Sequence, residues 1–281
     1  MNDNPRAACV IGWPVEHSRS PLIHNYWIGK HGIAGEYRRE PVRPEEFEVF
    51  VGELAQRGYV GANVTLPHKE AALALSDPDE RAQAVGAANT LWLDGGTLCS
   101  TNTDVEGFLA NLDDQTPGWD KGLDTAIVLG AGGAARGVIF GLQMRGIDTI
   151  RVVNRTVERA QALRERFGKE VKPAAWEELG GLLGGAGLLV NTTSLGMTGH
   201  PPLEIDLRDL PKSAVVCDLV YAPLVTPLLQ SAAALGLRQA DGLGMLLHQA
   251  VRGFSLWFGI TPEVTPDLRA LVEADLARPT E

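Results

Sequence analysis

The sequence predicts an α/β fold made of two domains, and three patterns indicate it. Before residue 104, short apolar runs rich in β-branched residues alternate with helical apolar spacing. A second alternating series begins at residue 125, after a polar segment at 113–124 that contains a proline and glycines. The last segment, 243–281, carries only helical spacing, as in a tail that packs back onto the first domain. We therefore expect one domain at 1–104 plus 243–281 and another at 105–242.

The strands expected in the first domain are apolar runs bounded by glycine, proline or polar residues. They lie at 7–11, 37–42, 61–66, 89–93 and 97–100, and the last two form a hairpin. Helices are expected at 20–30, 45–57, 67–75, 78–85 and 105–112. The first helix has Ser20 at the N-cap and Pro21 at the first helical position, where these residue types are preferred.

The strands expected in the second domain are continuous apolar runs, which are typical of a parallel sheet covered on both faces. They lie at 126–129, 150–153, 188–192 and 214–219. Helices are expected from residue 134 and at 157–167 and 226–235, and the tail that returns to the first domain is expected to hold two more, at 243–258 and 267–277. The glycine-rich segment 180–187 is expected to be a loop.

Composition and charge restrict the class of protein. The chain has 281 residues, 44 % of them hydrophobic and 21 % charged, with a net charge of −10. Such an acidic globular chain is not expected to bind nucleic acid or an anionic membrane. Its histidines and cysteines lack the spacing typical of metal ligands, so we expect no metal. Residues 1–6 lack the apolar core of a signal peptide, and no apolar run is long enough to span a membrane, which predicts a cytoplasmic protein.

A glycine-rich turn follows the first strand of the second domain. The strand at 126–129 leads directly into Gly130, Gly132 and Gly133, and a helical pattern starts near Ala134. A strand, a glycine turn and a helix in this order are typical of a dinucleotide site, because glycine lets the backbone approach a pyrophosphate at the helix N-terminus. The alternative is a tight turn that binds nothing.

The end of the next strand indicates which dinucleotide. NAD sites usually carry an acidic residue about 20 residues beyond the glycines, where it binds the ribose 2′-hydroxyl. Here that place holds Asn154, followed by Arg155 and Arg159. An arginine would bind a 2′-phosphate through paired N–H groups, so we expect NADP rather than NAD. The alternative is a solvated arginine at a strand end.

Three segments of the first domain are polar where strands end. Ser18 and Ser20 could both face one ligand such as a carboxylate, although Ser20 alone could be only a helix cap. Lys69 falls in the first turn of the expected helix 67–75, where it is either a proton-transfer group or a surface lysine. Asn89 and Asp104 lie near the ends of the hairpin strands, and Asp104 could pair with Lys69 as an acid/base couple.

Together these segments resemble the shikimate dehydrogenase family over nearly the whole chain. The matching motifs, in the family's order, are GWPVEHSRSP at 12–21, ANVTLPHK at 62–69, GAANT at 86–90, NTD at 102–104, GAGGA at 130–134, NRT at 154–156 and DGLGML at 241–246. The resemblance implies a two-domain enzyme with a Rossmann-type domain that reduces 3-dehydroshikimate to shikimate with NADPH, in aromatic amino-acid biosynthesis.

The resemblance also implies roles for single residues. Lys69 and Asp104 would be the catalytic pair, and Ser18 and Ser20 would bind the substrate carboxylate. The other substrate contacts would be Thr65, Asn89, Tyr221 and Gln249. The NADP contacts would be Gly130, Ala131, Gly132, Gly133, Ala134, Asn154, Arg155, Thr156, Arg159, Thr193, Leu219 and Gly242.

Two alternatives remain at this stage. One is a quinate/shikimate dehydrogenase with relaxed use of NAD and NADP, against which Arg155 and Arg159 argue. The other is a nucleotide-sensing regulatory protein without turnover, against which the presence of both Lys69 and Asp104 argues. The sequence leaves open whether the protein is a monomer or a homodimer.

Overall fold

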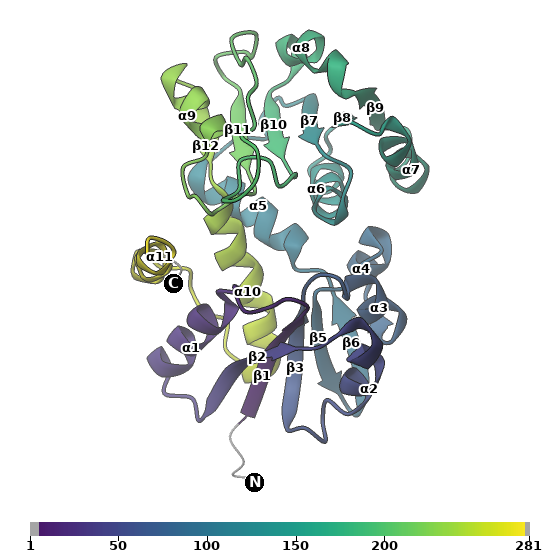
Figure 1. Ribbon diagram of the computed structural model, residues 1–281, viewed down its shortest axis with the longest axis vertical. Helices are drawn as coiled ribbons and strands as arrows, with labels where there is room; N and C mark the ends of the chain where they lie inside the picture. Colours follow the sequence, from purple (N-terminus) through teal and green to yellow (C-terminus); the bar gives the residue numbers. More distant parts are fainter. Residues whose placement is uncertain (1–5, 279–281) are drawn as a thin grey trace. The chain divides into compact units, whose positions relative to one another are not determined.

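The computed structural model describes residues 6–278 and divides the chain into two compact units (Figure 1). Unit 1 comprises Met1–Thr103 and Leu247–Glu281, and unit 2 comprises Asp104–Leu246. These limits lie one residue before the first predicted boundary and four residues after the second. Residues 1–5, in which the sequence predicts no signal peptide, and the last three residues of the predicted tail lie outside the described residues.

Unit 1 is built on a six-stranded mixed sheet with the order β2-β1-β3-β5-β6-β4. The strands are β1 (Arg6–Gly12), β2 (Gly35–Pro41), β3 (Tyr59–Val64), β4 (Asp77–Pro78), β5 (Thr90–Asp94) and β6 (Thr97–Thr101). β1 runs parallel to β2 and β3, whereas β5 runs antiparallel to β3 and β6. The carboxyl ends of β1, β3 and β6 and the start of β5 therefore meet at one edge of the sheet.

The helices of unit 1 include α1 (Ser20–Lys30), α2 (Phe47–Gly52), α3 (Lys69–Ala74), α4 (Glu80–Val85) and α11 (Pro266–Leu276). Side chains of β1 alternate between the two faces of the sheet. Cys9 and Ile11 belong to a core with Phe47 and Leu54. The predicted helix 45–57 is a short 3₁₀ turn followed by α2, and turns replace the helix from residue 53 onward.

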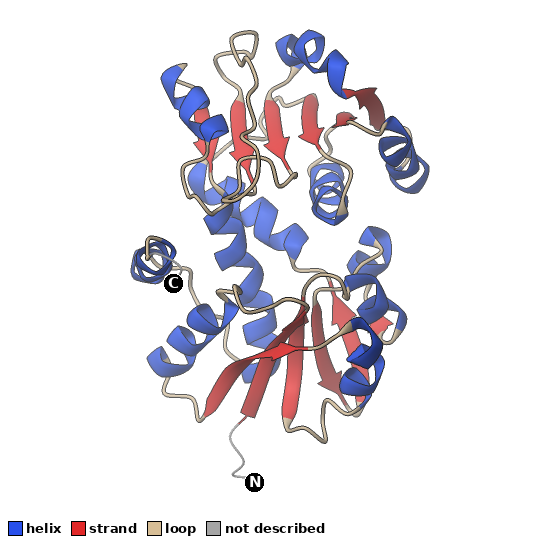
Figure 2. Cartoon of the chain, viewed as in Figure 1, coloured by secondary structure: helices blue, strands red, loops and turns tan. Residues whose placement is uncertain are grey.

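Unit 2 is a six-stranded sheet, parallel throughout, with the order β12-β11-β10-β7-β8-β9 (Figure 2). The strands are β7 (Thr125–Leu129), β8 (Thr149–Asn154), β9 (Val171–Ala175), β10 (Leu188–Asn191), β11 (Val215–Asp218) and β12 (Arg238–Ala240). The chain builds outward from β7 in one direction and then returns to build outward from β10 in the other. This is the strand order of a Rossmann fold, which confirms the predicted fold class.

The helices of unit 2 are α5 (Asp104–Gln115), α6 (Gly133–Met144), α7 (Val157–Phe167), α8 (Leu179–Leu182) and α9 (Pro227–Ala234). The helix α10 (Gly242–Phe258) starts in unit 2 and continues into unit 1. The predicted loop at 180–187 is mostly helical, because Leu179 and Leu183 are buried in the core beside it. Within the described chain, no helix has the length and apolar character needed to cross a bilayer.

Candidate active site

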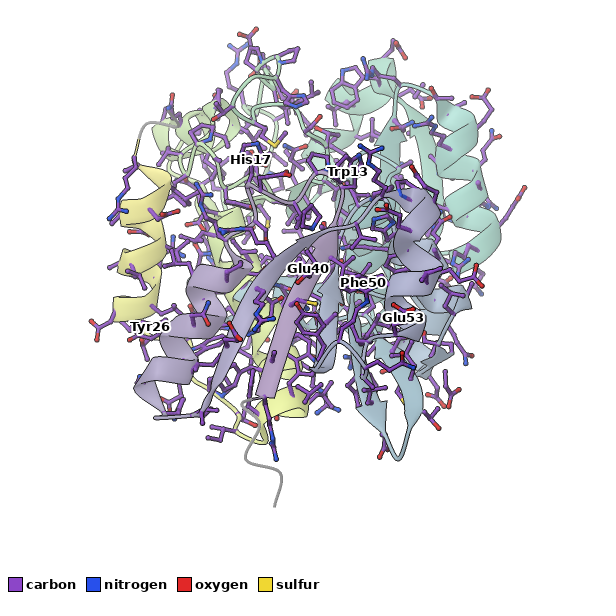
Figure 3. All side chains as sticks on the ribbon, turned by 60° about the horizontal axis from the view of Figure 1, so that its bottom comes forward. Trp13, His17, Tyr26, Glu40, Phe50 and Glu53 are labelled. Atoms are coloured by element: carbon purple, nitrogen blue, oxygen red, sulfur yellow. The ribbon has the colours of Figure 1, made fainter. Side chains whose placement is uncertain are left out.

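The shared sheet edge of unit 1 collects most of the predicted substrate residues. The turn between β1 and α1, in which Trp13 and His17 are labelled in Figure 3, carries Ser18 and leads into Ser20, the first residue of α1. Trp13 N in this turn donates to Leu66 O, in the loop after β3, at 3.0 Å, and Ala88 N, in the loop before β5, donates to Lys69 O at 2.9 Å. The loops that follow β1 and β3 and the loop that precedes β5 therefore form one connected surface.

Ser20 is predicted to be the N-cap of the first helix, but the structure gives the two serines other positions. α1 begins at Ser20, with Arg19 at the N-cap, and no side chain caps it. The hydroxyl of Ser18 accepts a hydrogen bond from Ser20 N at 3.3 Å. The prediction that Ser20 caps α1 is therefore wrong, because the helix includes Ser20 and the Ser18 hydroxyl satisfies its backbone N–H.

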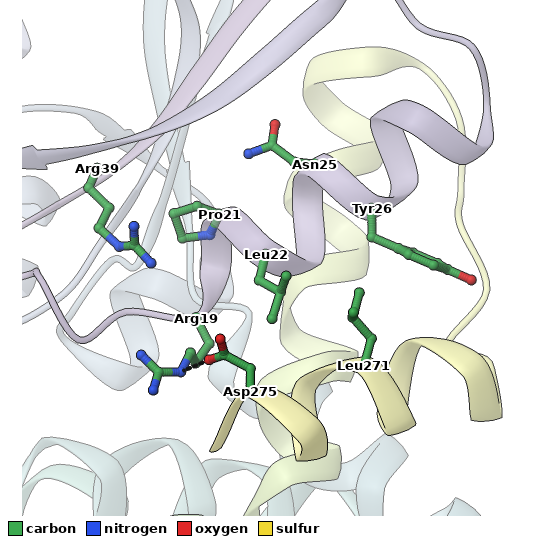
Figure 4. Close-up of a pocket in the computed structure, with 8 residues that line it drawn as sticks. All are labelled: Arg19, Pro21, Leu22, Asn25, Tyr26, Arg39, Leu271 and Asp275. Carbon is green, nitrogen blue, oxygen red and sulfur yellow. Dashed lines mark ion pairs between the residues drawn. The ribbon is translucent and has the colours of Figure 1, made fainter. Parts of the chain in front are cut away.

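Two arginines hold the turn that carries these serines. Arg39 on β2 donates to Ser18 O through Nε at 3.1 Å and through Nη2 at 2.8 Å. Arg19 Nε pairs with Asp275 Oδ2 on α11 at 2.5 Å. Both guanidinium groups line a pocket of about 410 Å³ between α1 and α11 (Figure 4). The pocket is lined by Arg19, Pro21, Leu22, Asn25, Tyr26, Arg39, Leu271 and Asp275 and contains none of the predicted site residues.

Lys69 is the first residue of α3, directly after a turn at 66–68, and its side chain is half-buried. The turn is anchored by His68, whose Nε2 lies 2.7 Å from Val42 O and whose ring stacks on Phe47 with centroids 4.4 Å apart. Thr65 lies on the same loop, and a Cβ at Gly12, the last residue of β1, would lie 2.4 Å from Thr65 Cγ2, so glycine at 12 allows this close approach. The structure thus places Thr65 and Lys69 on a tightly packed support.

Asn89 and Gln249 are brought together by Thr103, although the two residues come from distant parts of the chain. Asn89 is 3 % exposed, and its Oδ1 accepts from Thr103 N at 2.8 Å and from Thr103 Oγ1 at 3.1 Å. Thr103 Oγ1 also lies 3.4 Å from Gln249 Oε1 on α10. Asp104 follows directly as the first residue of α5 and of unit 2. The predicted catalytic aspartate is therefore the residue next to Thr103, which hydrogen bonds to both Asn89 and Gln249.

In unit 2, the glycine turn lies where the strand order reverses. Gly130 follows β7 with a φ of 100°, which favours glycine. A Cβ there would lie 2.9 Å from Thr193 Cγ2 and 3.0 Å from Thr192 Oγ1, in the loop after the neighbouring strand β10. In open α/β sheets, this is the position at which ligands bind.

The residues after Gly130 fit a pyrophosphate. Gly132 and Gly133 are exposed and lead into α6, a helix of 12 residues. A Cβ at either glycine would meet no atom within 4 Å, so the space before the helix is open. The first N–H groups of a helix have no partner within the helix and favour an anion. Ala131 and Ala134, also predicted cofactor contacts, lie in the same turn and are half-buried.

The end of β8 fits a 2′-phosphate. Val153 on β8 pairs with Leu129 on β7, so Asn154 lies beside the glycine turn. Asn154 Nδ2 donates to Thr156 O at 2.7 Å, which closes the turn that presents Arg155. Arg155 and Arg159 are exposed, and neither guanidinium makes an ion pair or hydrogen bond within residues 6–278. Two cations are thus available to a phosphate.

A buried carboxylate that the sequence pattern did not identify holds the neighbouring loops. Asp218 at the end of β11 is 0 % exposed. Its oxygens accept from Asn191 Nδ2 at 2.8 Å, from Thr226 Oγ1 at 2.6 Å and from Val220 N at 3.1 Å. Asn191 Oδ1 in turn accepts from Thr193 Oγ1 at 2.7 Å. Burial raises the pKa of Asp218, and these hydrogen bonds oppose the rise.

Two further predicted residues lie close to this carboxylate in the chain, and a third, Gly242, contacts the same loop. Leu219 and Tyr221 follow Asp218 and are half-buried. A Cβ at Gly242, the first residue of α10, would lie 2.3 Å from Leu219 O. The start of α10 and the loop after β11 therefore touch backbone to backbone, which requires glycine at 242.

Comparison with known proteins gives the same family throughout the chain. Residues 10–91 match the shikimate dehydrogenase substrate binding domain, residues 120–197 match shikimate / quinate 5-dehydrogenase, and residues 242–272 match the shikimate 5′-dehydrogenase C-terminal domain. A shikimate dehydrogenase (NADP(+)) from Nitrobacter hamburgensis is 66 % identical over 98 % of this chain and 96 % of that protein. One from Rhodopseudomonas palustris is 65 % identical over 99 % of both chains.

Solved structures agree in fold. Shikimate 5-dehydrogenase from Thermus thermophilus, in complex with NADP(H) and shikimate, has a TM-score of 0.83 at 36 % identity, covering 96 % of this chain and 99 % of that one. Quinate dehydrogenase from Corynebacterium glutamicum, in complex with NAD, has a TM-score of 0.88 at 32 % identity, with the same coverage. With its sequence motifs, its two units and these relatives in agreement, the chain belongs to the shikimate dehydrogenase family.

Proposed function

We propose that this chain catalyses the reversible, NADPH-dependent reduction of 3-dehydroshikimate to shikimate. The observation that carries the proposal is the identity of about two thirds, over 98–99 % of the chain, with proteins named shikimate dehydrogenase (NADP(+)). The two exposed arginines after β8 support the choice of cofactor. In unit 2, residues 130–134, 154–156 and 159 would hold NADP, with Thr193, Leu219 and Gly242 near its nicotinamide.

The cofactor, when bound, supplies the hydride that the ketone carbon accepts. As the ketone oxygen gains negative charge, the ammonium of Lys69 donates a proton to it, and Asp104 keeps the amine charged and oriented. In the oxidation direction, Lys69 as the neutral amine takes the proton of the hydroxyl. Ser18 and Ser20 would bind the substrate carboxylate, and Thr65, Asn89, Tyr221 and Gln249 would bind the remaining polar groups.

This mechanism assigns a role to each predicted domain. Residues 1–104 plus 243–281 would bind the substrate, and residues 105–242 would bind NADP. It also requires that Lys69 and the glycine turn open onto a common crevice. That crevice, the oligomeric state and the cytoplasmic location stay predictions.

A quinate/shikimate dehydrogenase is the second candidate, because a quinate dehydrogenase in complex with NAD has a TM-score of 0.88 with this chain. One set of assays separates the two. The purified protein is given shikimate or quinate with NADP⁺ or NAD⁺, and 3-dehydroshikimate with NADPH or NADH. We expect the highest kcat/KM for shikimate with NADP⁺. Higher kcat/KM for quinate, or for NAD⁺, would favour the second candidate, and no turnover of either substrate would reject both.

A further inference from the structure

Arg39 on β2 has no role in the proposed mechanism, but it holds Ser18, one of the residues proposed to bind the substrate carboxylate. Its Nε and Nη2 donate to Ser18 O at 3.1 and 2.8 Å, from the wall of the pocket between α1 and α11 (Figure 4). Hydrogen bonds from a charged donor are stronger than those between neutral groups, and the planar guanidinium directs both N–H groups at once. Among the predicted site residues in the described chain, Arg39 hydrogen bonds to Ser18 alone.

The remaining hydrogen bonds of Ser18 stay within its own turn and the start of α1. Ser18 N donates to Val15 O at 3.0 Å, and Ser18 Oγ accepts from Ser20 N at 3.3 Å. These bonds set the shape of the turn, but they do not fix its place relative to the sheet. Arg39 can do so, because its backbone pairs with Val10 on β1, the strand that leads into the turn. Within residues 6–278, the Arg39 guanidinium makes the hydrogen bonds that join Ser18 to the sheet.

These contacts leave the Ser18 hydroxyl as a donor. Its oxygen accepts from Ser20 N, and its proton has no acceptor in the part of the chain that the structure describes. An ionised carboxylate is an acceptor only, so it can take this proton. The Ser18 carbonyl oxygen is also only an acceptor and cannot bind a carboxylate. Since two Arg39 N–H groups hold this carbonyl oxygen, Ser18 has its hydroxyl to offer to an anion.

We propose that Arg39 is a positioning residue for the substrate carboxylate and acts through Ser18, whose carbonyl group it fixes to β2. This inference rests on the proposed function, in which Ser18 binds that carboxylate. A hydrogen bond between a hydroxyl and a carboxylate depends steeply on distance and angle, so a turn that can shift binds the carboxylate less well. Arg39 should therefore affect the binding of the substrate and not the transfer of hydride or proton.

The preceding residue of β2 offers a matched control for this proposal. Arg38 is also an exposed arginine, but its guanidinium pairs with Glu36 on the same strand. Arg38→Ala and Arg39→Ala therefore remove the same side chain and the same charge from adjacent positions of one strand. Only Arg39→Ala removes hydrogen bonds to Ser18.

The experiment measures kcat, KM for shikimate, KM for NADP⁺ and the melting temperature of wild type, Arg38→Ala, Arg39→Ala, Ser18→Ala and the double variant Ser18→Ala/Arg39→Ala. We expect Arg39→Ala to raise KM for shikimate by about 5- to 20-fold, as for lost hydrogen bonds from a charged donor, with kcat and KM for NADP⁺ changed less than about twofold. In the Ser18→Ala background, which already lacks the hydroxyl, Arg39→Ala should change KM for shikimate by less than about twofold more. Arg38→Ala should leave both KM values near wild type.

Equal KM values for shikimate in Arg38→Ala and Arg39→Ala would overturn the proposal. An effect of Arg39→Ala that persists in full in the Ser18→Ala background would also overturn it, because Arg39 would then act by its charge or on the fold and not through Ser18. If Arg39→Ala does not fold, Arg39→Met takes its place in the same comparison, since methionine keeps most of the apolar stem but has no N–H donor. A wild type without activity on shikimate would instead reject the proposed function, and the inference with it.

Discussion

The two units bury polar groups at the same place, the ends of their central strands, but with different chemistry. In unit 1 the hydrogen bonds that Asn63, Asn89, Thr90 and Thr103 make with one another join neutral groups, namely two amides and two hydroxyls. Unit 2 uses the carboxylate of Asp218, which accepts from an amide, a hydroxyl and a backbone N–H. The neutral network orients side chains, whereas the carboxylate ties the loops after β10 and β11 to each other.

This difference agrees with what each unit is proposed to bind. A ring with several hydroxyls needs donors and acceptors of fixed polarity, and neutral amides supply these at a small desolvation penalty. An extended dinucleotide needs loops at a fixed distance from the glycine turn. One buried acceptor shared by three donors meets that need. Asp104 and Tyr221 lie in unit 2 but are proposed to act on the substrate. For the other site residues, the comparison predicts that changes in unit 1 act on the substrate and changes in unit 2 act on the cofactor.

The largest effect expected from this division between the units is the loss of kcat in Lys69→Ala, in unit 1. Without the ammonium no side chain is assigned to protonate the ketone oxygen, so kcat should fall by about 10²–10⁴-fold, the usual contribution of a general acid. The dissociation constant for NADPH, measured by fluorescence, should stay near wild type. A variant that keeps most of kcat would remove Lys69 from the chemistry, and lost NADPH affinity would break the division between the units.

The matching test in unit 2 is Arg155→Ala. A charge-assisted hydrogen bond contributes about 1.5–3 kcal/mol, so kcat/KM with NADP⁺ should fall by about 10- to 100-fold. Activity with NAD⁺ and KM for shikimate should change little. Arg164→Ala is the control, since Arg164 is also exposed and lies on the following helix α7. Equal effects of the two variants would show that Arg155 is only a solvated arginine.

Sequence reasoning succeeded where a local pattern determines the structure. The strand at 126–129 and the glycine turn after it are confirmed, and α7 has the predicted bounds Val157–Phe167. It missed β9 and β12, because edge strands are short and only partly buried: β9 contains Pro173, and β12 is Arg238–Ala240. Neither strand shows the continuous apolar run that predicts a central strand.

Some residues of the candidate site could likewise be predicted from local sequence patterns, and others could not. The motifs locate residues such as Ser18, Lys69 and Arg155, because these types occur at strand ends with a recognisable spacing. The supporting residues Asn63, Thr90 and Asp218 could not be selected, because their roles depend on partners from other strands. A buried aspartate and a solvated one look the same in a sequence, and only the fold shows that Asp218 has three internal donors.

The two units also differ in how a buried titratable group makes their stability depend on pH. His24 in unit 1 is 0 % exposed and stacks on Tyr37 with ring centroids 4.1 Å apart. Burial lowers the pKa of His24 from 6.5 to about 3. The unfolded state therefore binds the proton first as the pH falls below 6.5, and this difference removes about 2 kcal/mol of stability by pH 5.

His24→Phe, which keeps an aromatic ring in the stack, should reduce the loss of unfolding free energy between pH 7 and pH 5 by about this amount. Urea denaturation at the two pH values measures it. His17→Gln serves as the control, because His17 is exposed. If His24→Phe and wild type lose the same free energy, His24 is not the group that makes unit 1 sensitive to acid.

Asp218 in unit 2 should give the smallest effect, and one of opposite sign. Burial raises its pKa above the ordinary 3.8, so the folded state holds the proton more tightly and stability falls as the pH rises through that range. The effect is small because three donors stabilise the carboxylate. Asp218→Asn should lose this component, so its stability relative to wild type should improve with rising pH above 4, after a constant loss of about 1 kcal/mol for a weakened hydrogen bond. The exposed Asp148→Asn is the control. If the difference in unfolding free energy between Asp218→Asn and wild type does not change with pH, the folded protein stabilises the Asp218 carboxylate as well as water does. The pKa of Asp218 would then not be raised, and the stability of unit 2 would not depend on its protonation.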